Sequence, residues 1–314
     1  MSVVPLVQGS VLVARGEATV VEFSAGMADV DAGVPCSAET RFQIASISKQ
    51  FTAAAVLLLA ERKSLTLDDP IGRWIGGCPD SWAGITLHHL LTHGSGLGHW
   101  RDYPMIDLTR WLAPEELLAV FQSAPPMFAP GSRWSYSSPG YVLLAHVAQR
   151  AADEPYREFL AQEIFAPLGM ARTFAGMPTG QDDIARGYSG DEPVRSFELD
   201  SVNMGTGDIW STTGDLLAWN DGLRAGRLLG ADSLRLMFTE HMPIDEGSRA
   251  HAYGYGWFFG TAAGEEILFH SGDNAGFKAF NACLPRSGRR IIVLSNQYDT
   301  GPAVVEELIS ATAT

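Results

Sequence analysis

The chain has 314 residues and a formal net charge of −14, from 22 Lys and Arg against 36 Asp and Glu. Its length favours one large domain or two interlocked domains, and a composition of 46% hydrophobic and 18% charged residues excludes a wholly disordered chain. The acidic surface would repel phosphate backbones and anionic lipid, so we expect neither a nucleic-acid nor a membrane partner.

The first elements predicted along the chain are a β-hairpin and a buried helix. Val11–Ala14 and Thr19–Phe23 are rich in β-branched residues and flank a turn at residues 15–17, a pattern typical of a hairpin. The segment from Ser46 to Leu65, SISKQFTAAAVLLLAERKSL, has helical character. Because its middle is apolar on nearly every face, we predict that this helix is buried.

Residues 66 to about 220 differ from the chain ends, because helical stretches alternate there with loops rich in Gly and Pro. Pro114 and Pro155 stand where a proline can open a helix. We therefore predict a mainly helical lobe over residues 66–224. Its helical stretches are Leu87–Leu91, Pro114–Phe121, Gly140–Ala152, Tyr156–Ile164 and Thr213–Leu223.

Strand patterns return in the C-terminal part, where Ser271–Gly276 is interpreted as a turn and Pro302–Ser310 as a final helix. Three consecutive strands and the N-terminal hairpin would form a five-stranded antiparallel sheet flanked by helices, if the chain ends meet. We predict a two-lobed α/β fold, in which residues 1–65 and 225–314 form the α/β lobe and the helical lobe is inserted. A site is expected in a cleft between the lobes. The strand-like runs are Tyr253–Phe259, Ile267–Phe269, Phe277–Leu284 and Ile291–Ser295.

Three features predict a cytoplasmic protein. The longest purely apolar run, Ala53–Ala60, is too short to cross a bilayer, and no basic residue precedes the first apolar stretch as in a secretory signal. Cys36, Cys78 and Cys283 are odd in number and lack C-x-x-C spacing, which favours buried thiols in a reducing compartment over disulfides or structural zinc. A chain from which an export signal had been trimmed would show the same pattern.

Ser46 and Lys49 form the sharpest local pattern, because residues three apart on a helix lie on one face. A serine hydroxyl becomes an effective nucleophile when a base within hydrogen-bond reach accepts its proton. Lys49 can accept that proton if burial and nearby positive groups lower its pKa. An unpaired ammonium at the start of a buried helix is costly, which favours a functional role over that of a solvated helix residue.

Two more polar stretches follow in order, Tyr136-Ser137-Ser138 ahead of a predicted helix and His270-Ser271-Gly272 at the end of a predicted strand. With the S-x-x-K stretch, they make the chain resemble the serine β-lactamase-like superfamily: class C β-lactamases, D-alanyl-D-alanine carboxypeptidases, D-aminopeptidases and related esterases. Seven collinear stretches carry the resemblance: FQIASISKQFTAAAVLLL, LTLDDPIGRWI, ITLHHLLTHGSGL, WSYSSPGYVLLAHV, FAPLGMARTF, GDIWSTTGDLLAW and LFHSGDNAGF.

The resemblance implies catalytic roles for three residues and a β-lactamase/transpeptidase-like fold without a cofactor. Ser46 would be the acylated nucleophile. Lys49 would be its base, or would hold the network that lets Tyr136 act as base. Tyr136 would also deliver the proton to the leaving group.

The resemblance also implies that five residues bind the substrate. Ser138 occupies the family's usual Asn position and would hydrogen-bond Lys49 or a substrate amide. His270 takes the place of the usual lysine in the third motif, which Ser271 and Gly272 complete, and we expect His270 to titrate near neutral pH. Asp273 follows directly after this motif.

Asp273 departs from the family pattern, because it places a carboxylate beside the implied oxyanion hole. That hole would consist of the backbone N–H groups of Ser46 and Asp273. The side chain of Asp273 must point away from the site, or it would oppose the developing negative charge. It could instead favour a cationic substrate amine, which we keep as a hypothesis.

Four histidines, His88, His89, His93 and His99, gather within twelve residues. His89 and His93 have a spacing that can bind metal on a helix, but no H-E-x-x-H is present. The matching segment is a structural loop in the family. We therefore predict no metal site and no cofactor.

The leading hypothesis is a serine hydrolase that cleaves an ester or amide, such as a small ester or a D-amino-acid peptide, through an acyl-enzyme on Ser46. An acyltransferase on the same scaffold, with an amine or alcohol in place of water, is the alternative. A penicillin-binding or sensor domain that does not turn over is a second alternative. We expect no counterpart of the family's usual helix before the first strand, and therefore also expect a homodimer that covers the sheet face.

Overall fold

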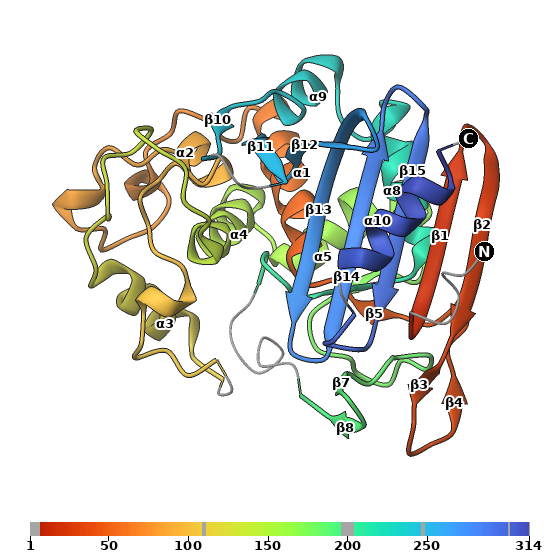
Figure 1. Ribbon diagram of the computed structural model, residues 1–314. Coiled ribbons are helices and arrows are strands. Elements are labelled where there is room, and N and C mark those ends of the chain that lie inside the picture. The colour runs from red at the N-terminus through yellow and green to blue at the C-terminus, as the bar shows by residue number, and fades with distance from the viewer. Residues whose placement is uncertain (1–6, 109–110, 196–203, 246–248, 301, 314) are drawn as a thin grey trace.

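An antiparallel sheet of eight strands forms the centre of the molecule, as a computed structural model shows for residues 7–108, 111–195, 204–245, 249–300 and 302–313 (Figure 1). The strand order is β10-β11-β12-β13-β14-β15-β1-β2. Gly9 of β1 pairs with Ser295 of β15, so segments from both ends of the chain meet inside the sheet, as the sequence predicts. The strands are β1 Gly9–Arg15, β2 Ala18–Ala25, β10 Met242–Pro243, β11 Ala250–Tyr253, β12 Phe258–Ala262, β13 Glu265–Asn274, β14 Phe277–Leu284 and β15 Arg289–Ser295.

The prediction of five strands is wrong. The four strand-like runs and the two hairpin strands already account for six segments of this sheet, one of those runs is itself two strands, and the edge strand β10 matches none of the expected runs. The expected strand Tyr253–Phe259 is two strands, β11 and β12, joined by a tight turn in which the Gly254 N–H donates to the Trp257 carbonyl at 2.8 Å. Gly256 in this turn has a φ of +79°, which favours glycine. The expected turn Ser271–Gly276 is also wrong, since β13 continues to Asn274.

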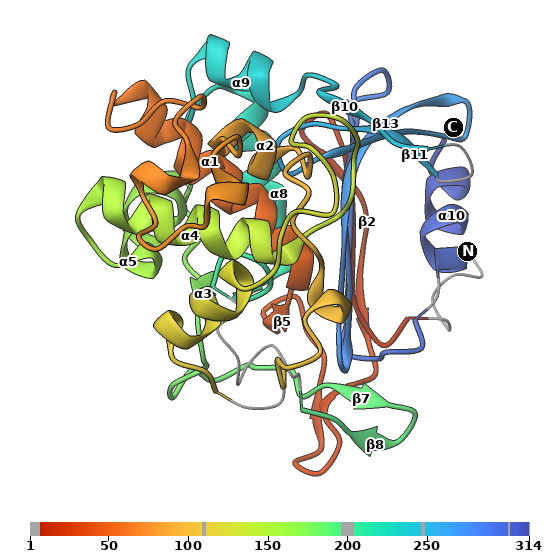
Figure 2. The same ribbon diagram turned by 90° about the vertical axis from the view of Figure 1, so that its left-hand side faces the viewer.

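Helices cover both faces of the sheet, giving three layers (Figure 2). α1 and α8 lie on one face and α10 lies on the other. The predicted helices are confirmed within a few residues of their ends, whereas α9 was not predicted. The α-helices are α1 Ser48–Glu61, α2 Leu87–Leu91, α3 Pro114–Gln122, α4 Ser138–Ala152, α5 Tyr156–Leu160, α6 Ala166–Leu168, α8 Thr213–Arg224, α9 Ala231–Met237 and α10 Pro302–Ala311. Short turns of other helix types are η2 Ala45–Ile47, η3 Ile71–Arg73, η4 Asp80–Trp82, η5 Trp100–Asp102 and the π-helical η6 Ala161–Phe165.

The helix α1 runs through the middle of the core. Every residue from Ser48 to Leu59 is buried, which confirms the prediction drawn from its apolar faces. Phe51 packs on Trp219 of α8, with 4.2 Å between ring centroids. A second apolar cluster, on the other face of the sheet, joins Ile267, Phe269 and neighbouring strand residues to α10. The sheet is therefore buried on both faces over its central strands.

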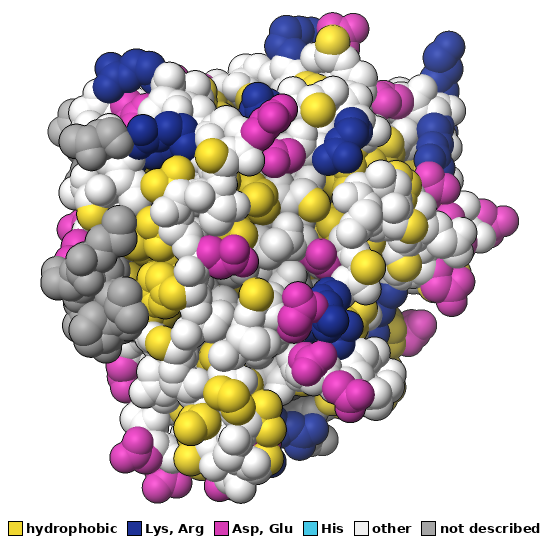
Figure 3. All heavy atoms as spheres, turned by 90° about the vertical axis from the view of Figure 1, so that its right-hand side faces the viewer, with side chains coloured by type: hydrophobic (Ala, Val, Ile, Leu, Met, Phe, Trp, Pro, Cys, Tyr) yellow, Lys and Arg dark blue, Asp and Glu magenta, His cyan; other side chains and the backbone are white. Residues whose placement is uncertain are grey.

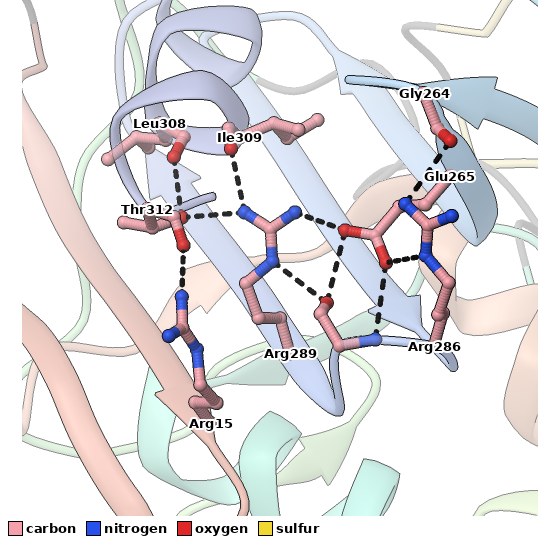
Figure 4. A network of polar contacts seen from close by, with 9 residues as sticks. Arg15, Gly264, Glu265, Arg286, Arg289, Leu308, Ile309 and Thr312 are labelled. Atoms are coloured by element: carbon pink, nitrogen blue, oxygen red, sulfur yellow. Dashed lines mark hydrogen bonds and ion pairs between the residues drawn. The ribbon is translucent and has the colours of Figure 1, made fainter. Parts of the chain in front are cut away.

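Buried charges fix α10 to the sheet (Figure 4). Arg289 forms an ion pair with Glu265, and both side chains are buried. The guanidinium of Arg289 also donates to the Ile309 carbonyl at 2.7 Å and to Thr312 Oγ1 at 3.1 Å. Carbonyls at a helix C-terminus lack intrahelical donors, and Arg289 supplies a donor to one of them. Its positive charge also interacts favourably with the negative end of the helix dipole.

Smaller β elements surround the sheet. The hairpin of β3 Met27–Asp29 and β4 Val34–Pro35 carries three exposed apolar side chains, Met27, Val30 and Val34. Hydrophobic side chains gather at the lower end of the face drawn in Figure 3, where this hairpin lies. The remaining strands are β5 Phe42–Gln43, β6 Phe174–Ala175 and β9 Ile209–Ser211 in one sheet, and β7 Tyr188–Ser189 with β8 Glu192–Pro193 in another.

The predicted division into two lobes at residues 66 and 224 stays a prediction. α8, which that division assigns to the helical lobe, packs against β15 and β1 of the sheet. All three cysteines are free thiols. Within the described part of the chain, none of the helices combines the length and the apolar character needed to cross a bilayer.

Candidate active site

Ser46 and Lys49 lie at the entrance to α1, where the short turn η2 leads into the helix. The ammonium of Lys49 donates to Ser46 Oγ at 2.9 Å and to the backbone carbonyl of Thr206 at 3.1 Å. Lys49 has an exposed fraction of 0%, whereas Ser46 is only half-buried. Ser46 thus keeps some exposed surface while its basic partner is fully buried.

The backbone just before Ser46 is strained. Ala45 has a φ of 47°, in the left-handed region that costs a residue with a Cβ about 1 kcal/mol or more. Strand β13 packs directly on this turn: a Cβ built on Gly272 would lie 2.2 Å from the carbonyl oxygen of Ile44. Only glycine allows this approach, so Gly272 sets the distance between β13 and the turn that holds Ser46.

A buried polar network holds the Thr206 carbonyl that accepts from Lys49. The N–H of Gly205 donates to Asp208 Oδ1 at 3.1 Å, and Arg157 pairs with the other oxygen of this carboxylate at 3.1 Å. The hydroxyl of Thr52, one turn beyond Lys49, donates to the Gly205 carbonyl at 2.7 Å. The loop 204–208 is therefore held by hydrogen bonds both to α1 and to Arg157 of α5.

Tyr136 covers Lys49 from the opposite side. The Lys49 ammonium lies 5.0 Å from the centroid of the Tyr136 ring, within the range of a cation–π interaction. The ring of Tyr136 also packs on His93, with 4.4 Å between centroids, and stacks on Phe258 at 6.3 Å. The structure thus brings together the three residues to which the resemblance assigns catalysis, from α1 and from the loop before α4.

Two histidines fix the loop that carries Tyr136. The N–H of Ser137 donates to His93 Nδ1 at 3.1 Å, and the N–H of Ser138 donates to His99 Nδ1 at 3.2 Å. Burial and the nearby charge of Lys49 lower the pKa of both rings, to about 4 for His99 and well below the usual range for His93. Both rings are therefore neutral acceptors at neutral pH. Ser138 itself is buried at the start of α4.

His270 lies on the inner face of β13, on the same side of the strand as Gly272. Its Nδ1 donates to the Ser271 carbonyl at 2.7 Å, so its Nε2 accepts from the hydroxyl of Tyr253 at 3.2 Å. Burial, and then the charge of Lys49, lower the pKa of His270 to about 3. The expectation that His270 titrates near neutral pH is wrong, because this buried ring is neutral there.

Ser271 and Asp273 point to the other face of the sheet, since side chains alternate along a strand. Both are exposed and line a hollow that also includes Val305 of α10. The Asp273 carboxylate pairs with Lys278 at 2.5 Å. The side chain of Asp273 thus points away from the site, and this geometry does not support the hypothesis that it binds a substrate amine.

Three side chains near Tyr136, those of His93, His99 and Tyr253, carry no sequence signal for the site. The spacing of the histidines indicates at most a weak metal pattern. In the structure, His88 Nδ1 lies 2.7 Å from the Tyr255 hydroxyl, so the four histidines have separate partners. Nowhere in the described ranges do three or more His, Cys, Asp or Glu side chains form a group that could hold a metal ion.

Comparisons with known proteins agree with this arrangement. A family model described as Beta-lactamase matches residues 5–312. Penicillin-binding protein 4* of Bacillus subtilis (strain 168) is 30% identical, over 93% of this chain and 68% of its own. Esterase EstB of Burkholderia gladioli is 31% identical, over 81% of this chain and 74% of its own. The crystal structure of D-amino acid amidase from Ochrobactrum anthropi SV3, complexed with L-phenylalanine, has a TM-score of 0.85 at 26% identity and covers 97% of this chain and 93% of that chain. This likeness confirms the predicted α/β fold class.

Proposed function

The chain belongs to the β-lactamase family, and from this premise we propose that it is a serine hydrolase that cleaves esters or amides through an acyl-enzyme on Ser46. Its relatives and structural neighbours include an esterase, a D-amino acid amidase and a penicillin-binding protein. The observation that carries the proposal is the 2.9 Å hydrogen bond between Lys49 Nζ and Oγ of the half-buried Ser46. A basic group within hydrogen-bond reach of the hydroxyl is what an activated serine requires.

In the acylation step, Ser46 Oγ attacks the substrate carbonyl carbon and its proton passes to the unprotonated Lys49 amine, or to Tyr136 acting as the base. The carbonyl oxygen becomes an oxyanion between the backbone N–H groups of Ser46 and Asp273. The close approach of β13 at Gly272 supports this role for Asp273. Loss of one such donor typically slows catalysis about 10²–10³-fold.

The tetrahedral intermediate then collapses and the bond to the leaving group breaks. The proton taken from Ser46 reaches the leaving oxygen or nitrogen through Tyr136: the phenol donates a proton, and protonated Lys49 returns one to the resulting phenolate. The acyl group stays on Ser46. In deacylation, a water molecule gives a proton to the same base and attacks the ester carbonyl. Ser46 leaves as the alcohol and the acid product departs.

We further propose that the substrate is a small ester or a D-amino-acid amide or peptide. The half-buried rings of Tyr136 and Phe258 stack near Ser46 and offer apolar surface to an acyl or leaving group. The three nearby imidazoles are neutral, so none of them contributes positive charge to the site. Ser138 would hydrogen-bond the substrate as a neutral group, whereas both ring nitrogens of His270 are engaged with Tyr253 and the Ser271 carbonyl, so His270 would act by holding Tyr253.

Intact-mass spectrometry tests the proposal. The protein is incubated with p-nitrophenyl acetate, penicillin G and D-phenylalanine amide, and the labelled peptide is mapped. We expect an acyl adduct on Ser46 that Ser46→Ala abolishes, while Ser123→Ala, at an exposed serine directly after α3, changes nothing. An adduct on another serine would refute the assignment of the nucleophile.

The same experiment separates the two alternatives. An added amine or alcohol that appears in an acylated product would indicate an acyltransferase. A burst of one equivalent of p-nitrophenol without steady turnover would indicate a penicillin-binding or sensor domain. Sustained release of the free acid supports hydrolysis.

We also propose a homodimer, because β2 is an edge strand of the sheet and carries the exposed apolar side chain of Val20. A monomer in light scattering at micromolar concentration would contradict it. The cytoplasmic location stays a prediction from the sequence.

A further inference from the structure

A cavity that does not include Ser46 lies between α8, α9 and the face of the sheet that α8 covers. Its volume is about 360 Å³, within the range of small-molecule sites. None of Ser46, Lys49, Tyr136 or His270 lines it. The cavity is therefore distinct from the candidate active site.

The walls of this cavity are mainly apolar. Hydrocarbon surface comes from Leu223 of α8, from Leu234 of α9 and Phe238 directly after it, and from Leu268 of β13. Trp257 also lines it, and the buried Nε1–H of this indole has no hydrogen-bond partner among the residues that the structure describes. Because buried donors are nearly always satisfied, this N–H indicates that an acceptor is missing from its surroundings.

Positive charge gathers at one end of the cavity. Arg224 and Arg290 both line it, and both share the carboxylate of Asp221, at 3.9 and 3.0 Å. Arg290 is 4% exposed and donates to the carbonyls of Gly288 and Gly16, whereas Arg224 is 64% exposed. Two guanidinium groups against one carboxylate leave an excess positive charge, on a chain whose net charge is −14. An anionic group would be attracted to this end.

We propose that this cavity binds an amphipathic monoanion, with its apolar body against the leucines and Phe238 and its carboxylate against Arg224. A carboxylate is the natural partner of a guanidinium, because its two oxygens match the planar fork of donors. An aliphatic or aromatic carboxylic acid combines both requirements, whereas a sugar or a dianionic phosphate would leave the apolar walls unfilled.

Thiol modification tests the proposal locally, because Cys283 is half-buried and lines the cavity. The wild-type protein is treated with N-ethylmaleimide with and without dodecanoate, and each cysteine is followed by peptide mass spectrometry. Cys78 is similarly half-buried but lies outside the cavity, so it serves as the internal reference. We expect dodecanoate to slow modification of Cys283 at least about fivefold and to leave Cys78 unchanged. Equal rates at Cys283 with and without dodecanoate would overturn the proposal.

Two matched variants test the role of charge. Arg224→Gln should weaken the protection by dodecanoate about three- to tenfold, the size expected of one partly exposed charge pair. Arg227→Gln removes the same charge three residues away, outside the cavity, and should leave the protection unchanged. Dodecanol, which has the same chain without the charge, should protect Cys283 less well than dodecanoate. Equal effects of both variants, or equal protection by the alcohol, would refute the site as an anion site.

Discussion

The close approach of β13 to the turn before Ser46 makes a sharp prediction for Gly272→Ala. The new Cβ would lie 2.2 Å from the Ile44 carbonyl oxygen, and contacts below 3.0 Å are essentially never found. The strand and the turn must therefore separate by about 0.8 Å, because both contacting groups belong to the backbone or lie next to it. A displacement of 1 Å between reacting groups can slow an enzyme about 10²-fold.

The expected result is a fall in kcat/KM for p-nitrophenyl acetate of about 10²-fold, since the N–H of Asp273 moves away from Ser46 Oγ. Overpacking of this kind also destabilises a fold by about 1–3 kcal/mol. Steady-state kinetics and thermal unfolding followed by circular dichroism measure the two effects separately. Gly76→Ala is the matched control, because a Cβ at Gly76 meets open space and its φ is not in the left-handed region.

The outcome that would refute the reasoning is a folded Gly272→Ala protein with kcat/KM within about threefold of the wild type. Such a result would mean that the two segments adjust without moving the oxyanion donor. A protein that loses thermal stability but keeps its activity per folded molecule would refute it equally. Either result would separate the packing of β13 from the proposed catalysis.

Three further predictions concern the site and the sheet. Lys49→Ala and Tyr136→Phe should each lower kcat/KM by about 10²–10⁴-fold, the usual contribution of acid–base catalysis, and full activity in either variant would contradict the proposed proton path. The profile of kcat/KM between pH 5 and 9 should contain no step from His270, whose pKa is about 3, and a step near pH 6.5 that His270→Gln removes would contradict this. Glu265→Gln should lower the free energy of unfolding by about 3 kcal/mol at pH 7, because it leaves a buried arginine without its counter-charge. Burial raises the pKa of Glu265, but hydrogen bonds from Arg289 and Ser287 and the charge of Arg289 outweigh this effect and hold the pKa below 4.5. The stabilisation by this ion pair is therefore present above pH 4.5 and lost as the pH falls further. Urea unfolding should show a smaller difference in free energy of unfolding between wild type and Glu265→Gln at pH 3 than at pH 7.

The sequence predicts the candidate nucleophile and its helix well, because their signals are local. The spacing of Ser46 and Lys49 and the apolar faces of α1 depend on few other residues. The pairing of β1 with β15 was also predictable, since strand patterns occur at both ends of the chain. α9 was missed because its short helical pattern, Ala231–Met237, has few periodic apolar residues.

The surroundings of Tyr136 could not be predicted, because they depend on tertiary contacts. His93 and His99 accept from the backbone of residues 137 and 138, and nothing in their spacing indicates this. The orientation of Asp273 was within reach of the sequence, however. Had residues 270–273 been assigned to a strand, alternation alone would have placed His270 and Gly272 on one face and Asp273 on the other.

The pairing of β1 with β15 has a consequence for biosynthesis. β1 pairs on one edge with β2, the next strand in the chain, but its partner on the other edge, β15, is made much later, so the hydrogen bonds of that edge wait for most of the chain. Contacts so distant in sequence slow folding, because the loop between them must close first. Until then the apolar residues of β1 are open to aggregation, and a nascent chain arrested before β15 should depend on chaperones.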